Sequence, residues 1–234
     1  MVIYYLRHLL PTINVLDPKL QSQNIKYHQF THHLNSSQLM CINFFLPIID
    51  DNILLEFIRK ATNINISNTA KIKEATFKKV FQNKDNTNFD FYLKLTTGEE
   101  IFFEIKYTEQ EFGGNCFDKG VLKSKYVDKY NNYYAAQIKK SLISSISMND
   151  FFKDYQINHN LSYIDSQNKY VIFILPFNSG DMLKELTTIT NKYINITNQV
   201  KVVDWTSLTN MALLEISNNL LHQHYRLFEE KYII

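Results

Sequence analysis

In residues 36–60, apolar side chains recur at the spacing of amphipathic helices. Residues 36–46 predict a helix that Ser36 caps and that ends before Pro47. Residues 52–60 predict a second helix, whose apolar positions share one face and which should stop near Asn63. This part of the chain is therefore expected to be helical.

From residue 71 onward, apolar and polar positions alternate, which is typical of strands. Residues 71–79 predict a first strand, and residues 88–96 and 100–108 predict two clearer ones. Only residues 97–99 separate the last two, so we expect these strands to form a hairpin.

Beyond the hairpin the pattern changes again. Residues 109–119 predict a loop, and residues 124–145 predict a long helix. Residues 171–175 are a continuous apolar run, which is typical of a strand buried on both faces. Residues 201–205 predict a further strand and residues 207–230 an amphipathic helix. This αβββαβ order predicts an α/β fold with a mixed central sheet flanked by helices.

Length and charge set limits on this picture. A chain of 234 residues with 45% apolar content can bury one substantial core, so we expect a single domain over residues 1–234. The net charge of +2 and the pI of about 8.3 are mild, whereas a strongly basic nucleic-acid-binding domain would lie above about pI 9. The overall charge therefore does not indicate a nucleic-acid partner, and such a partner has to be inferred from the residues of a specific site.

Cysteine usage and hydropathy indicate the cellular compartment in which the protein is expected. Cys41 and Cys116 are far apart and have no neighbouring His/Cys cluster, so the sequence indicates neither a disulfide scaffold nor a zinc site. No apolar run approaches the roughly 18 residues that span a bilayer, and Arg7 and His8 interrupt the apolar start of the chain. We expect no membrane association and a reducing, cytoplasmic location.

The triplet Glu104-Ile105-Lys106 places two charges on one face of an otherwise apolar strand. Alternate side chains point the same way, about 7 Å apart, and charges in such a strand are costly unless they are paired or bind a metal. An edge strand with solvated charges is the alternative. The triplet alone is weak, since residues 17–19 and 229–231 also match it and are interpreted as surface charge.

Pairing across the hairpin supplies a second criterion. An odd loop centred on Gly98 brings apolar residues opposite one another and gathers two carboxylates and one ammonium on one face. The pairs in this register are Phe91 with Ile105, Leu93 with Phe103, Leu95 with Ile101, Tyr92 with Glu104 and Asp90 with Lys106. A two-residue loop would put Asp90 and Glu104 on different faces, so we predict an odd loop or an equivalent bulge.

These residue types suit phosphodiester hydrolysis. The carboxylates of Asp90 and Glu104 are hard oxygen ligands for Mg²⁺, and the backbone carbonyl of Ile105 could complete the metal shell. Lys106 would position the attacking water and stabilise the negative charge of the transition state.

Asp90 followed by Glu104-x-Lys106 on successive strands, before a long helix, resembles the signature of the PD-(D/E)XK nuclease superfamily. The wider sequence is similar to a restriction-endonuclease-like branch over residues 30–140, with a looser match at 171–175. The strings that carry this similarity are Ser36-Ser37-Gln38, Asn43-Phe44, Asn88-Phe89-Asp90, Phe103-Glu104-Ile105-Lys106, Thr108-Glu109 and Glu111-Phe112-Gly113. The Pro-Asp dipeptide of the signature is absent, because Phe89 precedes Asp90.

The resemblance implies a restriction-endonuclease-like core with a helical part over residues 1–65, a catalytic core over 66–205 and a C-terminal helix over 206–234. It implies Mg²⁺, for which Mn²⁺ can substitute, held by Asp90, Glu104 and the Ile105 carbonyl. An additional acid often precedes the signature, and Glu74 or Glu56 could fill that role or be an exposed charge. Gln137 could face the site, although Ser141 breaks the Gln-x-x-x-Tyr form of exonuclease relatives.

Other polar groups have two interpretations. Glu109 and Glu111 could support the site or be ordinary loop acids. A lysine-rich stretch interleaved with Tyr126 and Tyr130 could contact DNA phosphates or form a solvated helix face; its lysines are Lys119, Lys123, Lys125 and Lys129. The histidine pairs 32–33 and 222/224 lack partners at ligand spacing.

We therefore expect a Mg²⁺-dependent endonuclease of double-stranded DNA, from restriction or defence, with a homodimer as the natural way to cut both strands. The alternatives are a structure-selective repair or mobile-element nuclease and a non-catalytic nucleic-acid-binding module. RNA as a substrate remains open.

Overall fold

A computed structural model describes residues 10, 36–49, 53–81, 88–141, 143, 145–194 and 197–233. The interpretations of residues 7–8, 17–19 and 32–33, and the predicted helix start at Asn52, lie outside these residues.

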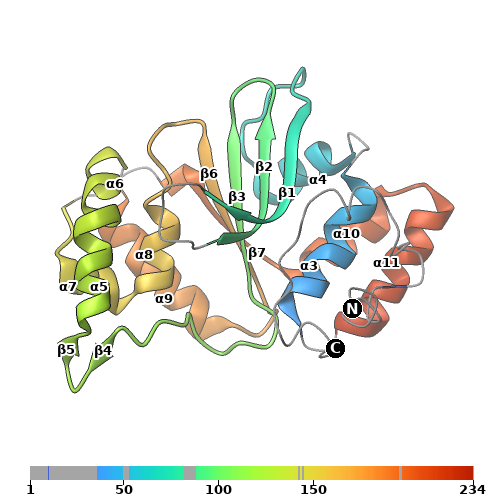
Figure 1. The fold of residues 1–234 in the computed structure, drawn as a ribbon. Helices are drawn as coiled ribbons and strands as arrows, with labels where there is room; N and C mark the ends of the chain where they lie inside the picture. Colours follow the sequence, from blue (N-terminus) through green and yellow to red (C-terminus); the bar gives the residue numbers. More distant parts are fainter. Residues whose placement is uncertain are drawn as a thin grey trace, which may run out of the picture.

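A five-stranded sheet lies at the centre of the molecule (Figure 1). The strands are β1 (Ile72–Val80), β2 (Asn88–Leu95), β3 (Glu100–Ile105), β6 (Lys169–Leu175) and β7 (Val200–Asp204), in the order β1-β2-β3-β6-β7. β1, β2 and β3 pair antiparallel, whereas β3, β6 and β7 pair parallel. The predicted α/β fold with a mixed sheet is confirmed.

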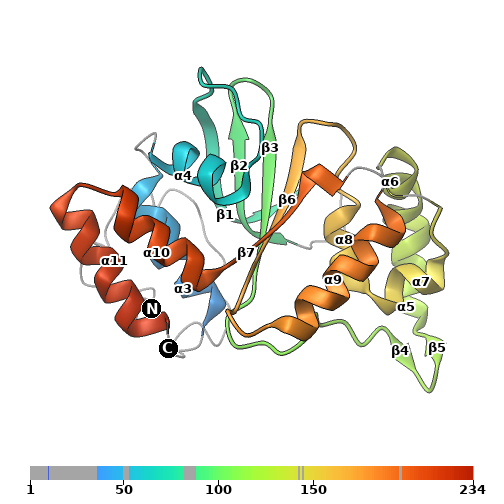
Figure 2. The same ribbon diagram turned by 180° about the vertical axis from the view of Figure 1, so that it is seen from behind.

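Helices cover both faces of the sheet, as Figures 1 and 2 show from opposite sides. One side carries α3 (Ser37–Phe45), α4 (Ile53–Thr62), α10 (Trp205–Glu215) and α11 (Asn219–Tyr232), with the 3-10 turn η1 (Leu46–Ile48) after α3. The other side carries α5 (Ser124–Lys129), the π-turn η2 (Tyr130–Tyr134), α6 (Ala135–Lys140), α7 (Met148–Lys153), α8 (Tyr155–Leu161) and α9 (Gly180–Tyr193). A small hairpin, β4 (Phe117–Asp118) and β5 (Val121–Leu122), precedes α5, and the 3-10 turn η3 (Thr197–Gln199) precedes β7.

Each face of the sheet has its own apolar core. Phe91, Leu93 and Phe103 face α3 and the C-terminal helices, where Phe45 stacks on Phe91 with ring centroids 4.6 Å apart. Tyr92 and Phe102 belong to the opposite core, beneath α7, α8 and α9. β6 contributes to both cores, which confirms a strand buried on both faces.

The hairpin between β2 and β3 has the predicted odd loop, but its register differs by two residues. Leu95 accepts from the N–H of Gly98 at 3.2 Å and donates to Glu99 at 2.9 Å, so the loop is residues 96–98 and its centre is Thr97. Gly98, with φ of 100°, supplies the left-handed last residue of this three-residue loop. Phe91 therefore pairs with Phe103, not Ile105, and Tyr92 with Phe102, not Glu104.

Several predicted helix boundaries are confirmed. The Ser36 side chain accepts from the N–H of Leu39 at the start of α3. α4 ends next to Asn63, whose φ of 50° is typical of a residue that terminates a helix. The single helix expected over 207–230 was wrong: α10 and α11 are separate, because Asn218 caps the second helix by accepting from Leu220 and Leu221.

The segment between β3 and β6 differs most from expectation. The helix predicted over 124–145 ends at Lys140, and α7 and α8 follow it unpredicted. α9, between β6 and β7, was also not predicted. α7 and α8 are only 6 and 7 residues long, too short for apolar periodicity to reveal. Across the described residues, no helix combines the length and apolarity that a membrane span requires.

Candidate active site

Asp90 lies at the edge of the sheet where three strands bring charged side chains together. β2 runs antiparallel to β1 and to β3, so its start lies beside the ends of both neighbours. Asp90, near the start of β2, meets Lys78 from β1 and Glu104 from β3. Continuing the β2–β3 register by one residue places Asp90 opposite Glu104.

Both carboxylate oxygens of Asp90 are engaged. Oδ2 accepts a hydrogen bond of 2.8 Å from the N–H of Ile105. Oδ1 forms a charged hydrogen bond with Nζ of Lys78. On the other face of the sheet, Sγ of Cys41 lies 3.8 Å from the Asp90 carbonyl oxygen and donates to it. The carboxylate is thus held in place at an almost buried position.

Glu104 is held by two carboxamides of α8. Gln156 donates through Nε2 to Oε1, and Asn160 donates through Nδ2 to Oε2 at 3.2 Å. These two residues are four apart on the helix, so their side chains project from the same face. Nζ of Lys106 lies 3.6 Å from Oε1 of Glu104, which completes an ion pair.

Lys106 follows the last residue of β3, and its backbone is held on both sides. Its N–H donates to Ile174 of β6 at 2.9 Å, and its carbonyl accepts from the indole N–H of Trp205 at 2.8 Å. Nζ donates to Oε1 of Gln156 at 2.7 Å and lies 5.5 Å from the ring centroid of Phe112. The ammonium therefore has a defined position beside Glu104.

Burial and charge shift the proton affinities of these groups. Burial and the neighbouring Asp90 carboxylate raise the pKa of Glu104 to about 7, although Lys106 and Lys78 act in the opposite direction. Burial by itself would lower the pKa of Lys78, but its contact with Asp90 outweighs that effect and the pKa rises. Burial raises the pKa of Cys41, and Asp90 adds to the increase.

Glu104 and Lys106 form an ion pair on the face that α8 covers, and Asp90 lies on the neighbouring strand, where its charge acts on the Glu104 carboxylate. The prediction that Asp90 and Glu104 share a face depended on an odd number of residues in the hairpin loop. The loop does have an odd number of residues, although the paired residues differ from those predicted. The pairing of Asp90 with Lys106 was wrong, because the loop is centred on Thr97 and Asp90 lies opposite Glu104. All three residues are nearly buried, with 6–7% of their surface exposed.

Three further polar residues of this cluster were missed from the sequence: Lys78, Gln156 and Asn160. Lys78 appeared only as one polar position of an alternating strand, and nothing in its sequence context marks it as a partner of Asp90. Gln156 and Asn160 do carry a signal, since two carboxamides spaced by four residues share a helix face.

The acids predicted to assist the site lie elsewhere. Glu74 pairs with Lys79 and accepts from Thr76 of its own strand, so its carboxylate is already engaged there. Glu109 accepts from the N–H groups of Tyr107 and Thr108 in a local turn. Glu56, the alternative to Glu74, pairs with Arg59 on α4, and Glu111 is exposed.

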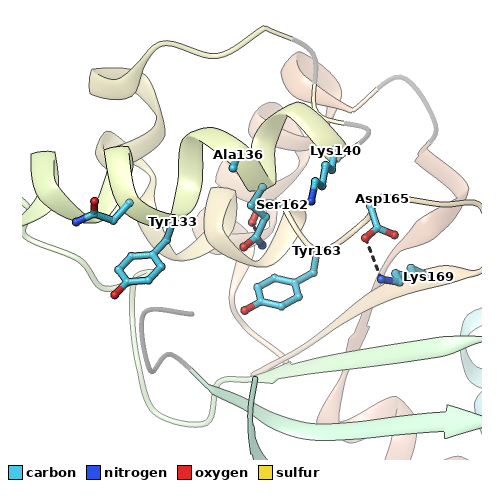
Figure 3. A pocket seen from close by; sticks show the side chains of 9 residues that line it. Tyr133, Ala136, Lys140, Ser162, Tyr163, Asp165 and Lys169 are labelled. Atoms are coloured by element: carbon cyan, nitrogen blue, oxygen red, sulfur yellow. Dashed lines mark hydrogen bonds and ion pairs between the residues drawn. The ribbon is translucent and has the colours of Figure 1, made fainter. Parts of the chain in front are cut away.

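Gln137 does not reach Glu104 or Lys106, because α8 lies between α6 and the sheet (Figures 1 and 2). It donates instead to the hydroxyl of Ser162 at 2.6 Å. Figure 3 shows the pocket that Gln137 helps to line, which has a volume of about 260 Å³. The pocket residues are Asn132, Tyr133, Ala136, Gln137, Lys140, Ser162, Tyr163, Asp165 and Lys169. The glutamine at the charged cluster is Gln156, not Gln137.

The four lysines proposed to contact DNA lie together on the β4–β5 hairpin and α5, here called the lysine arm. Figures 1 and 2 show that the hairpin projects away from the central sheet. Lys119 and Lys125 are exposed, and Lys125 lies 4.9 Å from the ring centroid of Tyr126. Lys123 donates to the carbonyl of Asn115 at 2.9 Å. The arm is thus a separate basic surface, outside the buried cluster.

The donor set of the cluster fits a hard divalent cation. Asp90, Glu104 and the Ile105 carbonyl offer oxygen ligands, as Mg²⁺ prefers. Burial first, and then the Asp90 carboxylate, raise the pKa of Glu104, and a cation between the two carboxylates would offset both effects. Among the described residues, no group of three or more His, Cys, Asp or Glu side chains is placed to hold a metal. His224 instead contacts the carbonyl of Asn43.

Comparison with known proteins gives a family. A family model described as "Restriction Endonuclease associating with ARP" matches residues 6–233, nearly the whole chain. No curated protein and no solved structure shows a significant match.

Proposed function

Because the chain belongs to the family of restriction endonucleases associating with ARP, we propose that it is a metal-dependent endonuclease of double-stranded DNA, in restriction or defence. The mixed five-stranded sheet is compatible with a restriction-endonuclease-like core. The observation that carries the proposal is the cluster of Asp90, Glu104 and Lys106 at one edge of that sheet, supported by α8.

We propose that Asp90, Glu104 and the Ile105 carbonyl hold Mg²⁺, with Mn²⁺ as a substitute. When bound, such an ion polarises the phosphodiester and makes a water molecule a better nucleophile at neutral pH. Asn160 and Gln156 keep the Glu104 carboxylate oriented toward Asp90. Gln156 also keeps the Lys106 ammonium beside that carboxylate, where it would offset the negative charge that develops on the phosphoryl oxygens.

The burial of the cluster sets a condition on this proposal. Asp90, Glu104 and Lys106 are almost inaccessible, so a phosphodiester reaches them only when covering side chains move. Lys78 is the most accessible member, with 22% of its side chain exposed. On the opposite flank, Gln156 also accepts from the N–H of Gly113, which ties the loop after β3 to the site.

DNA is the partner that this chemistry implies, and the exposed lysine arm would contact phosphates flanking the cleavage position. One chain contributes one cluster, which cuts one strand, so we propose a homodimer for double-strand cleavage. The alternative is a structure-selective nuclease of repair or of a mobile element. Such an enzyme would cut branched DNA in preference to linear duplex DNA.

The test is cleavage of supercoiled plasmid with Mg²⁺, beside Asp90→Asn and Lys106→Met. Both changes keep the side chain close in shape, and we expect each to reduce the cleavage rate by roughly 100-fold or more, since each removes a charge that acts on the transition state. Gel-shift binding in Ca²⁺ should be retained, which shows that the variants still fold. Full activity of either variant would remove the site assignment, whereas DNA binding by an inactive wild type would favour a non-catalytic module.

A further inference from the structure

Lys78 has no role in the proposed chemistry, yet it makes the most direct contact with Asp90. Its ammonium donates to Oδ1, while Oδ2 is already committed to the N–H of Ile105. Oδ1 is therefore the oxygen of Asp90 that a cation can bind without sharing it with the backbone N–H. Lys78 and a divalent cation would require the same atom.

Lys78 also has an unusual backbone conformation at the position from which its side chain contacts Asp90. Lys78 has φ of 53° near the end of β1, although the β1–β2 register is the same on either side of it. A left-handed conformation strains a non-glycine residue, and such strain is retained mainly where the side-chain position has a use. The neighbouring Lys79 has no such distortion among the described backbone outliers, and it pairs with Glu74.

Accessibility separates Lys78 from the rest of the cluster. Its side chain is 22% exposed, whereas Asp90, Glu104 and Lys106 have side chains only 7–9% exposed. A lysine whose stem reaches the surface can move its ammonium into water at little solvation cost. Lys78 is therefore the one of these four charged groups that can leave the site without unfolding it.

We propose that Lys78 is an exchangeable counter-ion, which competes with the divalent cation for Oδ1 of Asp90 and moves into solvent when the metal binds. The inference rests on the proposed function, because it concerns the metal that Asp90 would hold. The Lys78 ammonium lowers metal affinity in two ways: it occupies a ligand oxygen, and its positive charge repels a second cation. In exchange, it neutralises Asp90 whenever metal is scarce.

The experiment is a calorimetric titration of the full chain with Mn²⁺, which measures the affinity for the ion. Lys78→Met keeps the volume of the side chain and removes the charge, and we expect it to bind Mn²⁺ on the order of tenfold more tightly, the effect of removing one charged hydrogen bond. Lys78→Gly provides a second variant, because glycine adopts the left-handed backbone without strain. It should show the same gain.

Lys79→Met is the matched control. Lys79 is the adjacent lysine of the same strand and is also ion-paired, but with Glu74, so its removal should leave Mn²⁺ affinity within about twofold of wild type. Thermal melting gives an independent readout. Without metal, Lys78→Met should melt below wild type because Asp90 loses its partner, and Mn²⁺ should raise its melting temperature more than that of wild type.

The outcomes separate this inference from the proposed function. If wild type binds Mn²⁺ and both Lys78 variants bind it equally or more weakly, the counter-ion inference is overturned while the metal site stands. If Asp90→Asn abolishes binding in the wild-type and the Lys78→Met backgrounds, and Lys78→Met alone binds more tightly, the inference is supported. If no variant binds Mn²⁺, both proposals fail.

Discussion

The lysines of the central sheet and those of the lysine arm stand in opposite environments. Lys78 and Lys106 pair with the carboxylates of Asp90 and Glu104, and 22% and 7% of their side chains are exposed. Lys119 is exposed on a hairpin that projects from the molecule, and Lys125 is exposed on α5. Both groups are positively charged, and a nuclease can use both.

The difference teaches how burial decides what a charge does. A lysine as buried as Lys106 has lost its hydration and must be compensated by a fixed partner, so its removal disturbs both the fold and the site. An exposed lysine keeps its hydration, so its removal changes long-range attraction for a polyanion and leaves the fold almost unaffected. The tests below probe this contrast, from the largest expected change in the free energy of unfolding to the smallest.

The pH dependence of stability tests the buried carboxylate pair most strongly. The pKa of Glu104 is raised from 4.5 to about 7 in the folded protein, so the folded state keeps this proton to higher pH than the unfolded state does. The contribution of Glu104 to the free energy of unfolding should therefore be largest at pH 4.5 and below, and it should fall as the pH rises to about 7. We expect a loss of about 3 kcal/mol, since a tenfold change in an equilibrium corresponds to about 1.4 kcal/mol.

The measurement is urea unfolding in a chelating buffer between pH 4.5 and 8, for wild type and Glu104→Gln. The variant cannot titrate at this position, so its curve should lack the fall. Parallel curves for the two proteins would show that the pKa of Glu104 is not raised, and both its burial beside α8 and its closeness to Asp90 would be in doubt.

Two glutamines, one at the charged cluster and one away from it, give the next test. Gln156 contacts Glu104, Lys106 and the N–H of Gly113, whereas Gln137 contacts Ser162 beside the pocket. Both are partly buried. Gln156→Leu removes one hydrogen-bond partner from each of Glu104 and Lys106 and should lower the free energy of unfolding by about 1–3 kcal/mol, together with the cleavage rate.

Gln137→Leu is the matched control, because it removes a neutral hydrogen bond away from the cluster. It should cost about 1 kcal/mol or less and leave cleavage unchanged. Chemical denaturation and plasmid cleavage measure the two effects. Equal losses of activity in both variants would mean that α6, as well as α8, supports the site.

The lysine arm should give the smallest change in stability. Replacing Lys119, Lys123, Lys125 and Lys129 together with Gln should alter the free energy of unfolding by less than about 1 kcal/mol, because two of these side chains are exposed and the other two are only half-buried. DNA affinity should nevertheless fall, and the slope of log K against log salt should decrease by about 0.9 for each phosphate contact removed. An unchanged slope, measured by fluorescence anisotropy, would exclude the arm from the DNA interface.

The sequence determined the hairpin and the faces of its strands. Alternation over 88–96 and 100–108 determines which residues share a face, and any odd loop keeps Asp90 and Glu104 on one face. The loop position was not determined to the residue, because loops centred on Thr97 and on Gly98 both keep that parity. The family match covers nearly the whole chain, consistent with the resemblance found in the short strings.

Only the tertiary structure decided what surrounds the two acids. Lys78 reaches Asp90 because β1 pairs beside β2, and Gln156 reaches Glu104 because α8, rather than α6, lies against β3. Such contacts join residues separated by 12 and 52 positions, so local periodicity carries no information about them. Residue patterns specify which face a side chain takes, whereas the partner on that face depends on how distant elements pack.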